Sequence, residues 1–406
     1  MTGGRRDGRA AGRSGRPAVH RVVPAAVLLL VATTLHAQTA PTYRVIAGAE
    51  SDDQAALIEF TPCTGGLTPP ACGARVTRTW EVGLYPADIE GPHGIVASHD
   101  GQSFYVSLAH GRPFGLLQRY DMATGRMTGE VELGMFPATV DIAPGSDIIY
   151  VINFNFDDPE MQPSSLSVVD GETMTELARI PTCRMPHGSR VNPQGTRHYS
   201  GCMMNDLLVE VDALELRVSR LFNVAPGHEG AVDPSLLATP AAATGASMPA
   251  HDAHGDHTGL AMSNLCSPTW AQPSADGAKV YVACNKSNEI VEVDVKSWTM
   301  TRRWSTPRAP YNLAVTPDGR LLIATQKGPG TTSIWRLSDA KLLADVKDTR
   351  GVASGVAVSA DSRYAFTTLE GVGGQPGTVD VIDLDALARV ATVDMGKQAG
   401  GIAVVP

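Results

Sequence analysis

The sequence predicts an all-β protein, a seven-bladed β-propeller made of four-stranded antiparallel blades. Three observations lead to this expectation. A motif of about fifteen residues recurs along the chain, its copies lie about one blade apart, and incomplete strand sets at the two ends complement each other. A fixed period of this size indicates stacked units instead of one conventional core.

Each copy of the motif has an apolar strand, a turn rich in Asp and Gly, and a second strand that usually contains Tyr-Val. Six segments contain it: PHGIVASHDGQSFYV (Pro92–Val106), FPATVDIAPGSDIIYV (Phe136–Val151), MPHGSRVNPQGTRHYS (Met185–Ser200), SPTWAQPSADGAKVYV (Ser267–Val282), APYNLAVTPDGRLLIA (Ala309–Ala324) and ASGVAVSADSRYAFT (Ala353–Thr367). Their turn residues are 44, 50, 82, 42 and 43 residues apart, counted from Gly101 to Ser362. A propeller blade takes about 40–45 residues, so each copy marks one blade.

The segments between the motifs supply the remaining strands of each blade. A third strand ends in Asp in LLQRYD (Leu116–Asp121), LSVVD (Leu166–Asp170), LLVEVD (Leu207–Asp212), EIVEVD (Glu289–Asp294) and TVDVID (Thr378–Asp383). A more polar fourth strand follows, as in Arg126–Leu133 and Trp298–Ser305. Short strands bounded by Gly, Pro, Asp and Asn are typical of β-sheet blades.

The 82-residue interval does not hold two blades. Residues 225–264 are rich in Ala, Pro, Gly and His and contain neither a Tyr-Val strand nor an Asp-Gly turn. We therefore interpret them as an insertion between two blades.

The two ends of the chain are expected to share the seventh blade. Gly400–Pro406 supplies only a first strand, while Tyr43–Glu50, Ala56–Pro62 and Arg78–Leu84 supply the other three. Pairing them would close the ring and remove exposed edge strands. Residues 38–406 are thus expected to form a single propeller domain.

The Asp-Gly-x-x-x-Tyr-Val pattern, with its following Val-x-Asp, resembles the YVTN-type β-propeller repeat. This group includes surface-layer repeats, periplasmic propellers and lactonase-like propellers. The resemblance covers nearly all of the chain after residue 37 except the insertion. It implies the fold and leaves the activity open, because propellers host many unrelated functions.

Residues 1–37 have the pattern of a secretory signal peptide. Six arginines between Arg5 and Arg21 precede the apolar run Val22–Leu35, which is too short for a spanning helix. Cleavage is expected after Ala37, although Leu35 stands where a small residue is preferred, and an uncleaved anchor is the alternative. The mature protein is therefore expected in the periplasm or outside the cell.

The mature chain is acidic. Removing residues 1–37 removes six Arg and one Asp, which changes the net charge from −9 to about −14. An acidic surface argues against nucleic acid and anionic membranes as partners. No other apolar run is long enough to span a bilayer.

The motif register predicts a functional face at the mouth of the central channel. The residues eight positions before four of the turn glycines are His93, His187, Thr269 and Tyr311, so they should occupy matching places there. His110 belongs to a loop on the same face. The insertion should emerge there too, with His228 and the cluster His251, His254 and His257.

These histidines are candidate metal ligands. Three His at i, i+3 and i+6 can hold zinc or copper, because neutral imidazole is a good ligand for both ions. The alternative is a solvated linker, with His93 and His187 bonded to neighbouring blades. Covalent haem is not expected, because the chain lacks Cys-x-x-Cys-His.

The six cysteines are expected to form three disulfides. Cys183 and Cys202 flank the first two strands of one blade, and Cys266 and Cys284 occupy the same places in the next blade. Cys63–Cys72 lies within one Pro/Gly-rich loop. Such pairs fit an oxidising compartment, and a thiolate metal site is the alternative.

Three functions remain open. The first is a secreted or periplasmic propeller that binds a small ligand or a protein on the channel-mouth face, with or without copper or zinc. The lactonase-like resemblance implies a hydrolase, for which His93, His187, Arg112 and Arg308 are candidates, although the calcium ligands of that family do not map onto this chain. The third is a metal- or quinone-dependent oxidoreductase component. No nucleophile elbow, phosphate loop or His-Glu-x-x-His motif occurs.

Overall fold

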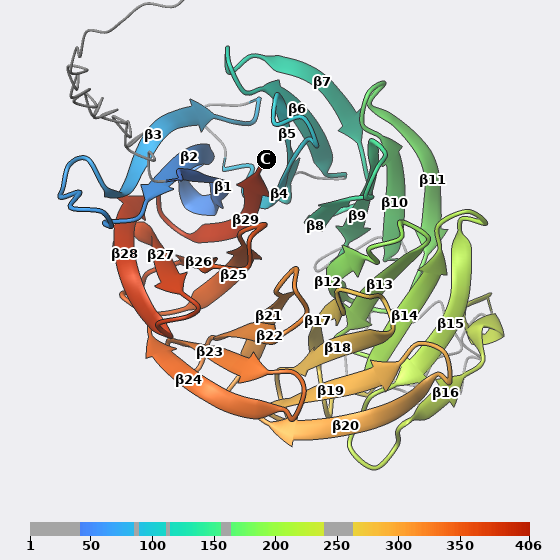
Figure 1. Cartoon of the computed structure of the whole chain (residues 1–406). Coiled ribbons are helices and arrows are strands. Elements are labelled where there is room, and N and C mark those ends of the chain that lie inside the picture. Colours follow the sequence, from blue (N-terminus) through green and yellow to red (C-terminus); the bar gives the residue numbers. More distant parts are fainter. Residues whose placement is uncertain (1–40, 85–88, 111–113, 156–163, 239–262) are drawn as a thin grey trace, which may run out of the picture. The chain divides into compact units, whose positions relative to one another are not determined.

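The computed structural model describes residues 41–84, 89–110, 114–155, 164–238 and 263–406. These residues form seven antiparallel sheets arranged in a ring around a central channel (Figure 1). This confirms the expected seven-bladed β-propeller. The expected signal peptide, residues 1–37, lies outside the described residues, as do residues 239–262 of the insertion.

Blades 1 and 2 follow the closing strands in chain order. Blade 1 has β4 (Pro92–Ala97), β5 (Ser103–Leu108), β6 (Leu116–Asp121) and β7 (Met127–Glu132). Blade 2 has β8 (Pro137–Ile142), β9 (Ile148–Asn153), β10 (Ser165–Asp170) and β11 (Thr175–Pro181). In each blade the first strand lies at the channel and the fourth at the rim (Figure 1).

Blades 3 and 4 flank the insertion. Blade 3 has β12 (Pro186–Val191), β13 (Arg197–Cys202), β14 (Leu207–Asp212) and β15 (Arg217–Asn223). Blade 4 has β17 (Pro268–Pro273), β18 (Lys279–Cys284), β19 (Glu289–Asp294) and β20 (Thr299–Ser305). The first part of the insertion adds a fifth strand to blade 3, β16 (Gly230–Val232), and a short 3-10 helix, η2 (Pro234–Ala238).

Blades 5 and 6 complete the regular series, and the seventh blade is composite. Blade 5 has β21 (Pro310–Val315), β22 (Leu321–Gln326), β23 (Thr331–Arg336) and β24 (Lys341–Lys347). Blade 6 has β25 (Ala353–Val358), β26 (Tyr364–Leu369), β27 (Gly377–Asp383) and β28 (Ala388–Met395). The closing blade has β29 (Ala399–Val405), β1 (Tyr43–Ala49), β2 (Gln54–Thr61) and β3 (Gly73–Glu81). A 3-10 turn, η1 (Glu50–Asp52), joins β1 to β2.

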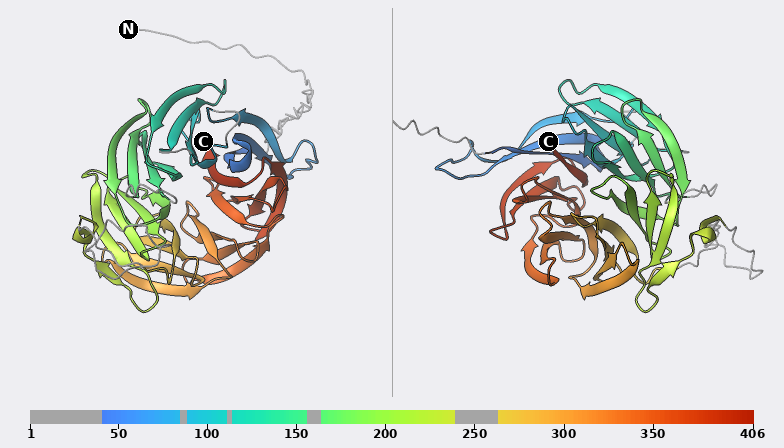
Figure 2. Two further views of the ribbon diagram at one scale, coloured as in Figure 1. Left: turned by 180° about the vertical axis from the view of Figure 1, so that it is seen from behind. Right: turned by 45° about the vertical axis from the view of Figure 1, so that its right-hand side comes forward.

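The closing blade joins the two ends of the folded chain as expected. Strand β29 pairs antiparallel with β1, from Arg44 opposite Val405 to Ala49 opposite Ala399. The contrast between blue β1–β3 and red β29 makes this junction visible from both sides of the ring (Figure 2). Both β1 edges are therefore hydrogen-bonded within the sheet.

The recurring Asp-Gly turn has a structural task. In blade 1 the Ser98 hydroxyl donates to Asp100 at 2.6 Å, and Gly101 adopts a φ of 66°. Glycine meets this left-handed conformation without the steric cost of a Cβ atom. The same Ser/Thr–Asp bond recurs at Ser274–Asp276 and Thr316–Asp318, so the motif specifies the turn between the first two strands.

The hydrophobic core lies between blades. Seven clusters of buried apolar side chains each combine residues of two neighbouring blades. One example packs Tyr150 and Ile152 of blade 2 against Val209 and Leu221 of blade 3. Because each blade buries its faces only against its neighbours, the closed ring is the unit that hides all of this apolar surface. No helix in the described part of the chain has the length and apolar character needed to cross a bilayer.

Candidate functional site

The face of the channel where the first strands begin carries a ring of residues in equivalent positions. In every blade the residue before the first strand is left-handed, with φ between 51° and 65°: Gly91, Phe136, Met185, Ser267, Ala309, Val352 and Gln398. Its carbonyl accepts a 2.9–3.2 Å hydrogen bond from the residue that follows the second strand: Ala109, Phe154, Met203, Asn285, Lys327, Glu370 and Glu50. Because this left-handed conformation repeats in all seven blades, it belongs to the architecture.

These positions enclose a cavity of about 590 Å³ at the channel mouth. It is lined by Glu50, His93, Ala109, His110, Met135, Phe136, Phe154, His187, Met203, Tyr311, Lys327, Ser354, Glu370 and Gln398. Six of the seven residues that follow a second strand lie in this lining. The volume is within the range of about 300–1,000 Å³ that is typical of small-molecule sites.

A buried carboxylate organises one side of the cavity. Glu50, only 5% exposed, accepts a hydrogen bond from His93 Nδ1 at 3.2 Å and another from His110 Nε2 at 2.8 Å. Burial alone would raise the pKa of Glu50, but the two histidines outweigh it and lower the pKa. The bond to Glu50 raises the pKa of His110 against the effect of burial. Glu50 is therefore a carboxylate that holds both rings in place.

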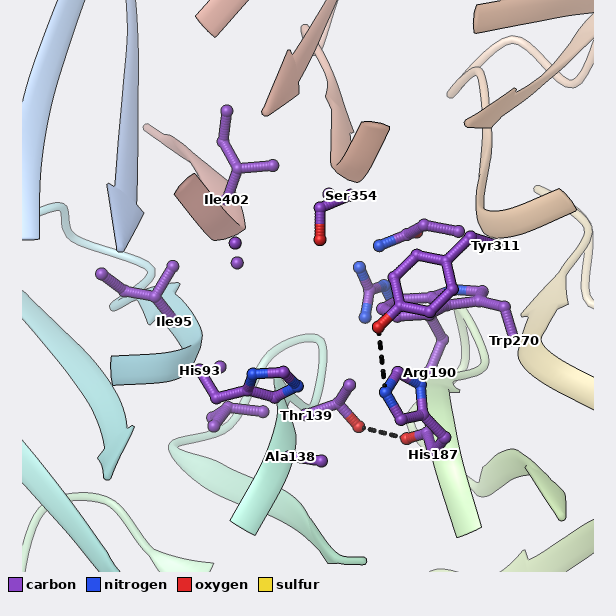
Figure 3. A pocket seen from close by; sticks show the side chains of 16 residues that line it. His93, Ile95, Ala138, Thr139, His187, Arg190, Trp270, Tyr311, Ser354 and Ile402 are labelled. Atoms are coloured by element: carbon purple, nitrogen blue, oxygen red, sulfur yellow. Dashed lines mark hydrogen bonds between the residues drawn. The ribbon is translucent and has the colours of Figure 1, made fainter. Parts of the chain in front are cut away.

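The opposite side is built on His187, whose hydrogen bonds determine its tautomer. His187 Nδ1 lies 3.1 Å from the Thr269 carbonyl oxygen, which can only accept, so Nδ1 carries the proton. Nε2 then accepts from the Tyr311 hydroxyl at 3.1 Å. Burial, with a further contribution from His93, lowers the pKa of His187 to about 3. This imidazole is neutral, and Figure 3 shows it next to Tyr311.

A third polar pair, Lys327 and Glu370, lines the cavity at the channel mouth. Lys327 Nζ lies 2.9 Å from Glu370 Oε1 and 3.9 Å from the centre of the Tyr311 ring. Burial would lower the pKa of Lys327, but Tyr311 and Glu370 outweigh it and raise the pKa. The ammonium group therefore stays charged and combines an ion pair with a cation–π contact.

Aromatic rings form the apolar wall between these polar groups. The Phe136 ring centre lies 5.6 Å from that of His93 and 5.4 Å from that of His110. Phe154 lies 5.6 Å from Phe136 and 5.4 Å from His187. Such edge and tilted contacts restrict the rings and keep an apolar surface facing the cavity.

Deeper in the channel the cavity narrows to a space of about 40 Å³, which we call the neck. The neck shares four lining residues with the cavity, His93, His187, Tyr311 and Ser354, and also includes Arg190. It narrows because glycines let the first strands pack closely. A Cβ atom on Gly401 would lie 2.5 Å from the His93 carbonyl oxygen, and one on Gly355 would lie 2.5 Å from the Gly400 carbonyl oxygen.

The structure brings together part of the sequence-predicted set. His93, His187, Thr269 and Tyr311 lie in matching places on their first strands, and His110 joins them through Glu50. His228 is exposed between β15 and β16 and does not line the cavity. Arg308 is exposed and outside the lining. The predicted ligands His251, His254 and His257, and Arg112, lie outside the described residues.

The described residues contain no group of three or more His, Cys, Asp or Glu arranged to hold a metal ion. Glu50, His93 and His110 converge, but their converging atoms are joined to one another by hydrogen bonds. Copper or zinc binding therefore remains a prediction, since the main predicted ligands, His251, His254 and His257, lie outside the described residues.

All six cysteines are paired as expected, four of them in the two pairs that the repeat register predicts. The disulfides are Cys63–Cys72, Cys183–Cys202 and Cys266–Cys284, with no free cysteine in the chain. Cys202 immediately precedes Met203 of the cavity wall. The pairs thus lie at the ends of strands on the channel-mouth face, apart from Cys63–Cys72 in the β2–β3 loop.

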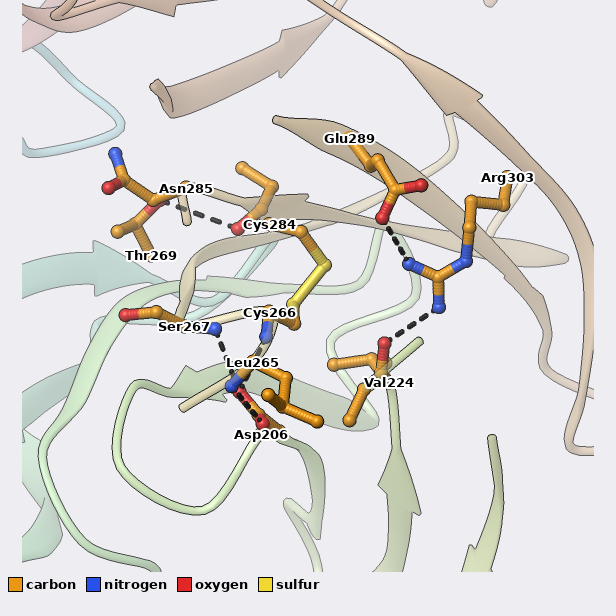
Figure 4. Close-up of a disulfide and its surroundings, with 12 residues drawn as sticks. Asp206, Val224, Leu265, Cys266, Ser267, Thr269, Cys284, Asn285, Glu289 and Arg303 are labelled. Carbon is orange, nitrogen blue, oxygen red and sulfur yellow. Dashed lines mark hydrogen bonds and ion pairs between the residues drawn. A yellow bond between two sulfur atoms is a disulfide. The ribbon is translucent and has the colours of Figure 1, made fainter. Parts of the chain in front are cut away.

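The returning end of the insertion is fixed beside the Cys266–Cys284 disulfide (Figure 4). Asp206, fully buried, accepts hydrogen bonds from the backbone nitrogens of Leu265 at 2.7 Å and Ser267 at 2.7 Å. The leaving end is tied by Arg303, which bonds the Val224 carbonyl and Glu229. The described ends of the insertion are therefore anchored on blades 3 and 4.

Sequence reasoning missed the residues that complete the cavity, above all Glu50, Lys327, Glu370, Phe154 and Arg190. The first four follow a second strand, so aligning the ends of the second strands as well as the starts of the first strands would have found them. Arg190 lies within a first strand, and nothing in the sequence distinguishes it from the other arginines of the chain.

Comparison with known proteins supports the fold. No protein-family model matches the chain, and no curated protein matches it. Among solved structures, Kuenenia stuttgartiensis hydrazine synthase is similar, with 18% identity, a TM-score of 0.59, and coverage of 79% of this chain and 91% of that chain. A functionally unknown protein from Desulfotomaculum acetoxidans DSM 771 has 14% identity, a TM-score of 0.61, and coverage of 89% and 98%. At these identities the likeness establishes the propeller architecture alone.

Proposed function

We propose that this chain is an extracytoplasmic binding protein that holds a small ligand in the cavity at the channel mouth. The observation that carries the proposal is the cavity itself: its polar groups are held by defined partners, while an aromatic wall faces the open space. A concave site with an apolar wall and a few fixed polar groups is the usual form of a small-molecule site. The three disulfides support an oxidising compartment.

Two of the titratable side chains in the cavity are already engaged by other residues. His187 is a neutral ring with both nitrogens engaged, and Glu50 is occupied by His93 and His110. Of the candidates for the lactonase alternative, His93 and His187 line the cavity, Arg308 lies outside the lining, and Arg112 lies outside the described residues. A general base would need a free basic atom within hydrogen-bond reach of a substrate proton. For the hydrolase alternative, His93 is the candidate that meets this requirement, because its Nδ1 is bonded to Glu50 and its Nε2 has no hydrogen-bond partner among the described residues.

Gly400 offers a direct test, because it lies in the neck and a Cβ atom there would meet nothing closer than 3.8 Å. Gly400→Phe should fill the neck and extend toward His93, while Gly400→Ala should leave it open. The purified protein would be tested by calorimetry and thermal unfolding with three probes of one shape, benzoate, benzamide and benzylamine, at millimolar concentration. A ligand at about 100 times its Kd should add about 2.7 kcal/mol to stability.

The proposal expects at least one probe to bind the wild type and Gly400→Ala, and to lose binding to Gly400→Phe. If no probe binds, or if the Phe variant binds like the wild type, the channel mouth is not the binding site. Unliganded melting temperatures of the three proteins serve as the folding control.

A further inference from the structure

We propose that the ligand carries a carboxylate, which the Arg190 guanidinium binds in the neck while the rest of the ligand occupies the cavity above. This inference rests on the proposed binding function and adds the chemical class of the ligand. It starts from the position of Arg190 on β12, three residues beyond His187 and therefore deeper in the channel. Figure 3 shows its side chain among Tyr311, Trp270 and His187.

Arg190 is held in place but lacks a direct counter-ion. Its guanidinium lies over the Trp270 ring, 4.6 Å from the ring centre, and its Nη1 donates to the Ser189 carbonyl at 2.8 Å. No described carboxylate oxygen lies within the 4 Å ion-pair distance of its nitrogens, whereas Lys327 at the rim is paired with Glu370. A planar guanidinium with unused donors matches a carboxylate through two parallel hydrogen bonds.

The surrounding charges leave room for an added anion. The acidic group that acts on the Arg190 charge is Asp141 of blade 2, whose Oδ2 accepts from the Val191 backbone nitrogen. Burial raises the pKa of Asp141 more than Arg190 and the backbone hydrogen bonds lower it. Burial lowers the pKa of Arg190, and the charge of Asp141, which makes no ion pair with it within 4 Å, offsets only part of that effect. Glu50 at the mouth is matched by His93 and His110. A ligand carboxylate would thus meet the one channel cation that has no direct anionic contact among the described residues.

The shape of the space selects a small anionic group joined to a larger body. The volume of about 40 Å³ is the space open to the centres of water-sized spheres. On this measure one water molecule needs about 10–15 Å³, so the neck admits a few waters or one carboxylate. The adjoining cavity of about 590 Å³ takes the body of the ligand against Phe136 and Phe154. A compact planar carboxylate fits the neck better than the bulkier tetrahedral phosphate.

Two further polar groups line the neck. Ser354, 7% exposed, points its hydroxyl into the pocket (Figure 3). Asn312, 5% exposed, has a side-chain oxygen with no hydrogen-bond partner among the described residues. A serine hydroxyl donates to a carboxylate, and an amide can turn to present its NH₂ group. Both groups would gain a partner when the neck is occupied.

The test compares one ring with three head groups by isothermal titration calorimetry. Wild-type protein should bind benzoate at least about tenfold more tightly than benzamide, the amount expected for one charge-assisted contact. Arg190→Gln should weaken benzoate by about tenfold or more and leave benzamide unchanged within about threefold. The benzoate affinity of Arg190→Lys should lie between those of the wild type and Arg190→Gln, because lysine keeps the charge and loses the planar fork.

Two controls keep the result independent of folding. Unliganded melting temperatures identify any Arg190 variant that fails to fold, and Ser354→Ala then provides the second test, with an expected benzoate loss of about three- to tenfold. Arg119→Gln is the matched control, since Arg119 is also partly buried between blades but bonds Gly171 outside the channel. It should bind benzoate like the wild type.

The possible outcomes separate the two proposals. Equal affinity for benzoate and benzamide, a preference for benzylamine, or unchanged benzoate binding by Arg190→Gln would overturn the carboxylate assignment. If neutral or cationic probes still bind in a Gly400→Phe-sensitive way, the binding function stands without it. If no probe binds, both proposals fail.

Discussion

Replacing Glu50 with glutamine should remove the charge that holds His93 and His110 at the cavity. The carboxylate accepts one hydrogen bond from each ring, and Glu50 itself is almost completely buried. A glutamine of the same shape has one acceptor and one donor, so it can satisfy only one of the two histidine N–H groups. The other ring must turn away or change its tautomer.

The size of the effect follows from those two bonds. A hydrogen bond to a charged group contributes about 1.5–3 kcal/mol. The His93 side chain is 19% exposed and that of His110 is 41% exposed, so solvent weakens the second contact more. With one bond retained by the amide, we expect Glu50→Gln to lose about 2 kcal/mol in free energy of unfolding near pH 5.5.

The loss should depend on pH in both directions. The pKa of Glu50 is lowered from 4.5, so its contribution is complete above pH 4.5 and declines progressively as the pH falls from that value through the lowered pKa. The pKa of His110 is raised from 6.5, so its contribution is complete below pH 6.5 and disappears as the pH rises through the raised pKa. The difference between wild type and variant should therefore be largest between pH 4.5 and 6.5.

Urea unfolding at pH 4, 5.5, 7 and 9 measures this difference curve. Glu370→Gln is the control, because the Glu370–Lys327 pair contains no histidine and should give no decline between pH 6.5 and 9. A Glu50→Gln difference that is constant with pH, or largest at pH 9, would refute the reasoning.

Three further measurements address other parts of the chain. Burial, with a contribution from nearby Asp380, raises the pKa of Asp348 from 3.8 to about 7, so this carboxyl costs stability as the pH rises from 4 to 7. Asp348→Asn should therefore be more stable at pH 8 by up to about 4 kcal/mol and equal near pH 4; a pH-independent gain would contradict this. The double replacement Cys266→Ser and Cys284→Ser removes the disulfide that joins two residues 18 positions apart. It should lower the free energy of unfolding, measured by calorimetry, by about 3 kcal/mol, and an unchanged melting temperature would count against this. Elemental analysis should find copper or zinc that is lost when all three histidines of His251–His257 become Ala, and a metal-free protein of unchanged stability would disprove metal binding.

The fold could be predicted because its determinants are local and repeated. Each hairpin is specified by nearby residues: an Asp-Gly turn, a strand such as those around Tyr105 and Tyr281, and an Asp that ends the third strand. These signals recur once per blade, so the whole ring could be predicted from them. The composite blade was also predictable, since four strands had to be shared between two incomplete ends. The short strand β16 was not, because Gly230–Val232 has no alternating pattern and pairs only through the edge that β15 offers.

The site was only partly predictable, for a geometric reason. The register of first strands placed His93, His187 and Tyr311 together, because equivalent residues of neighbouring blades face one axis. It did not reveal that Glu50, beyond the end of β1, would meet His93 of the next blade, because Glu50 follows a second strand and the register compared only first strands. Nor could it show that Arg190 lies against Trp270, which depends on side-chain packing between two blades.

Ring closure by β29 and β1 has a consequence for how the protein folds after synthesis. Partners such as Ala49 and Ala399 lie at opposite ends of the folded chain, so this contact has a very long loop to close and forms slowly. Until β29 emerges, β1 presents an unpaired edge, and Glu50 sits at the end of a blade that is still incomplete. A chain that stops short of β29 would therefore lack part of the candidate site, including Gly400 and Gly401 of the neck, as well as its last strand. The proposed ligand binding would therefore report that synthesis and ring closure have both been completed.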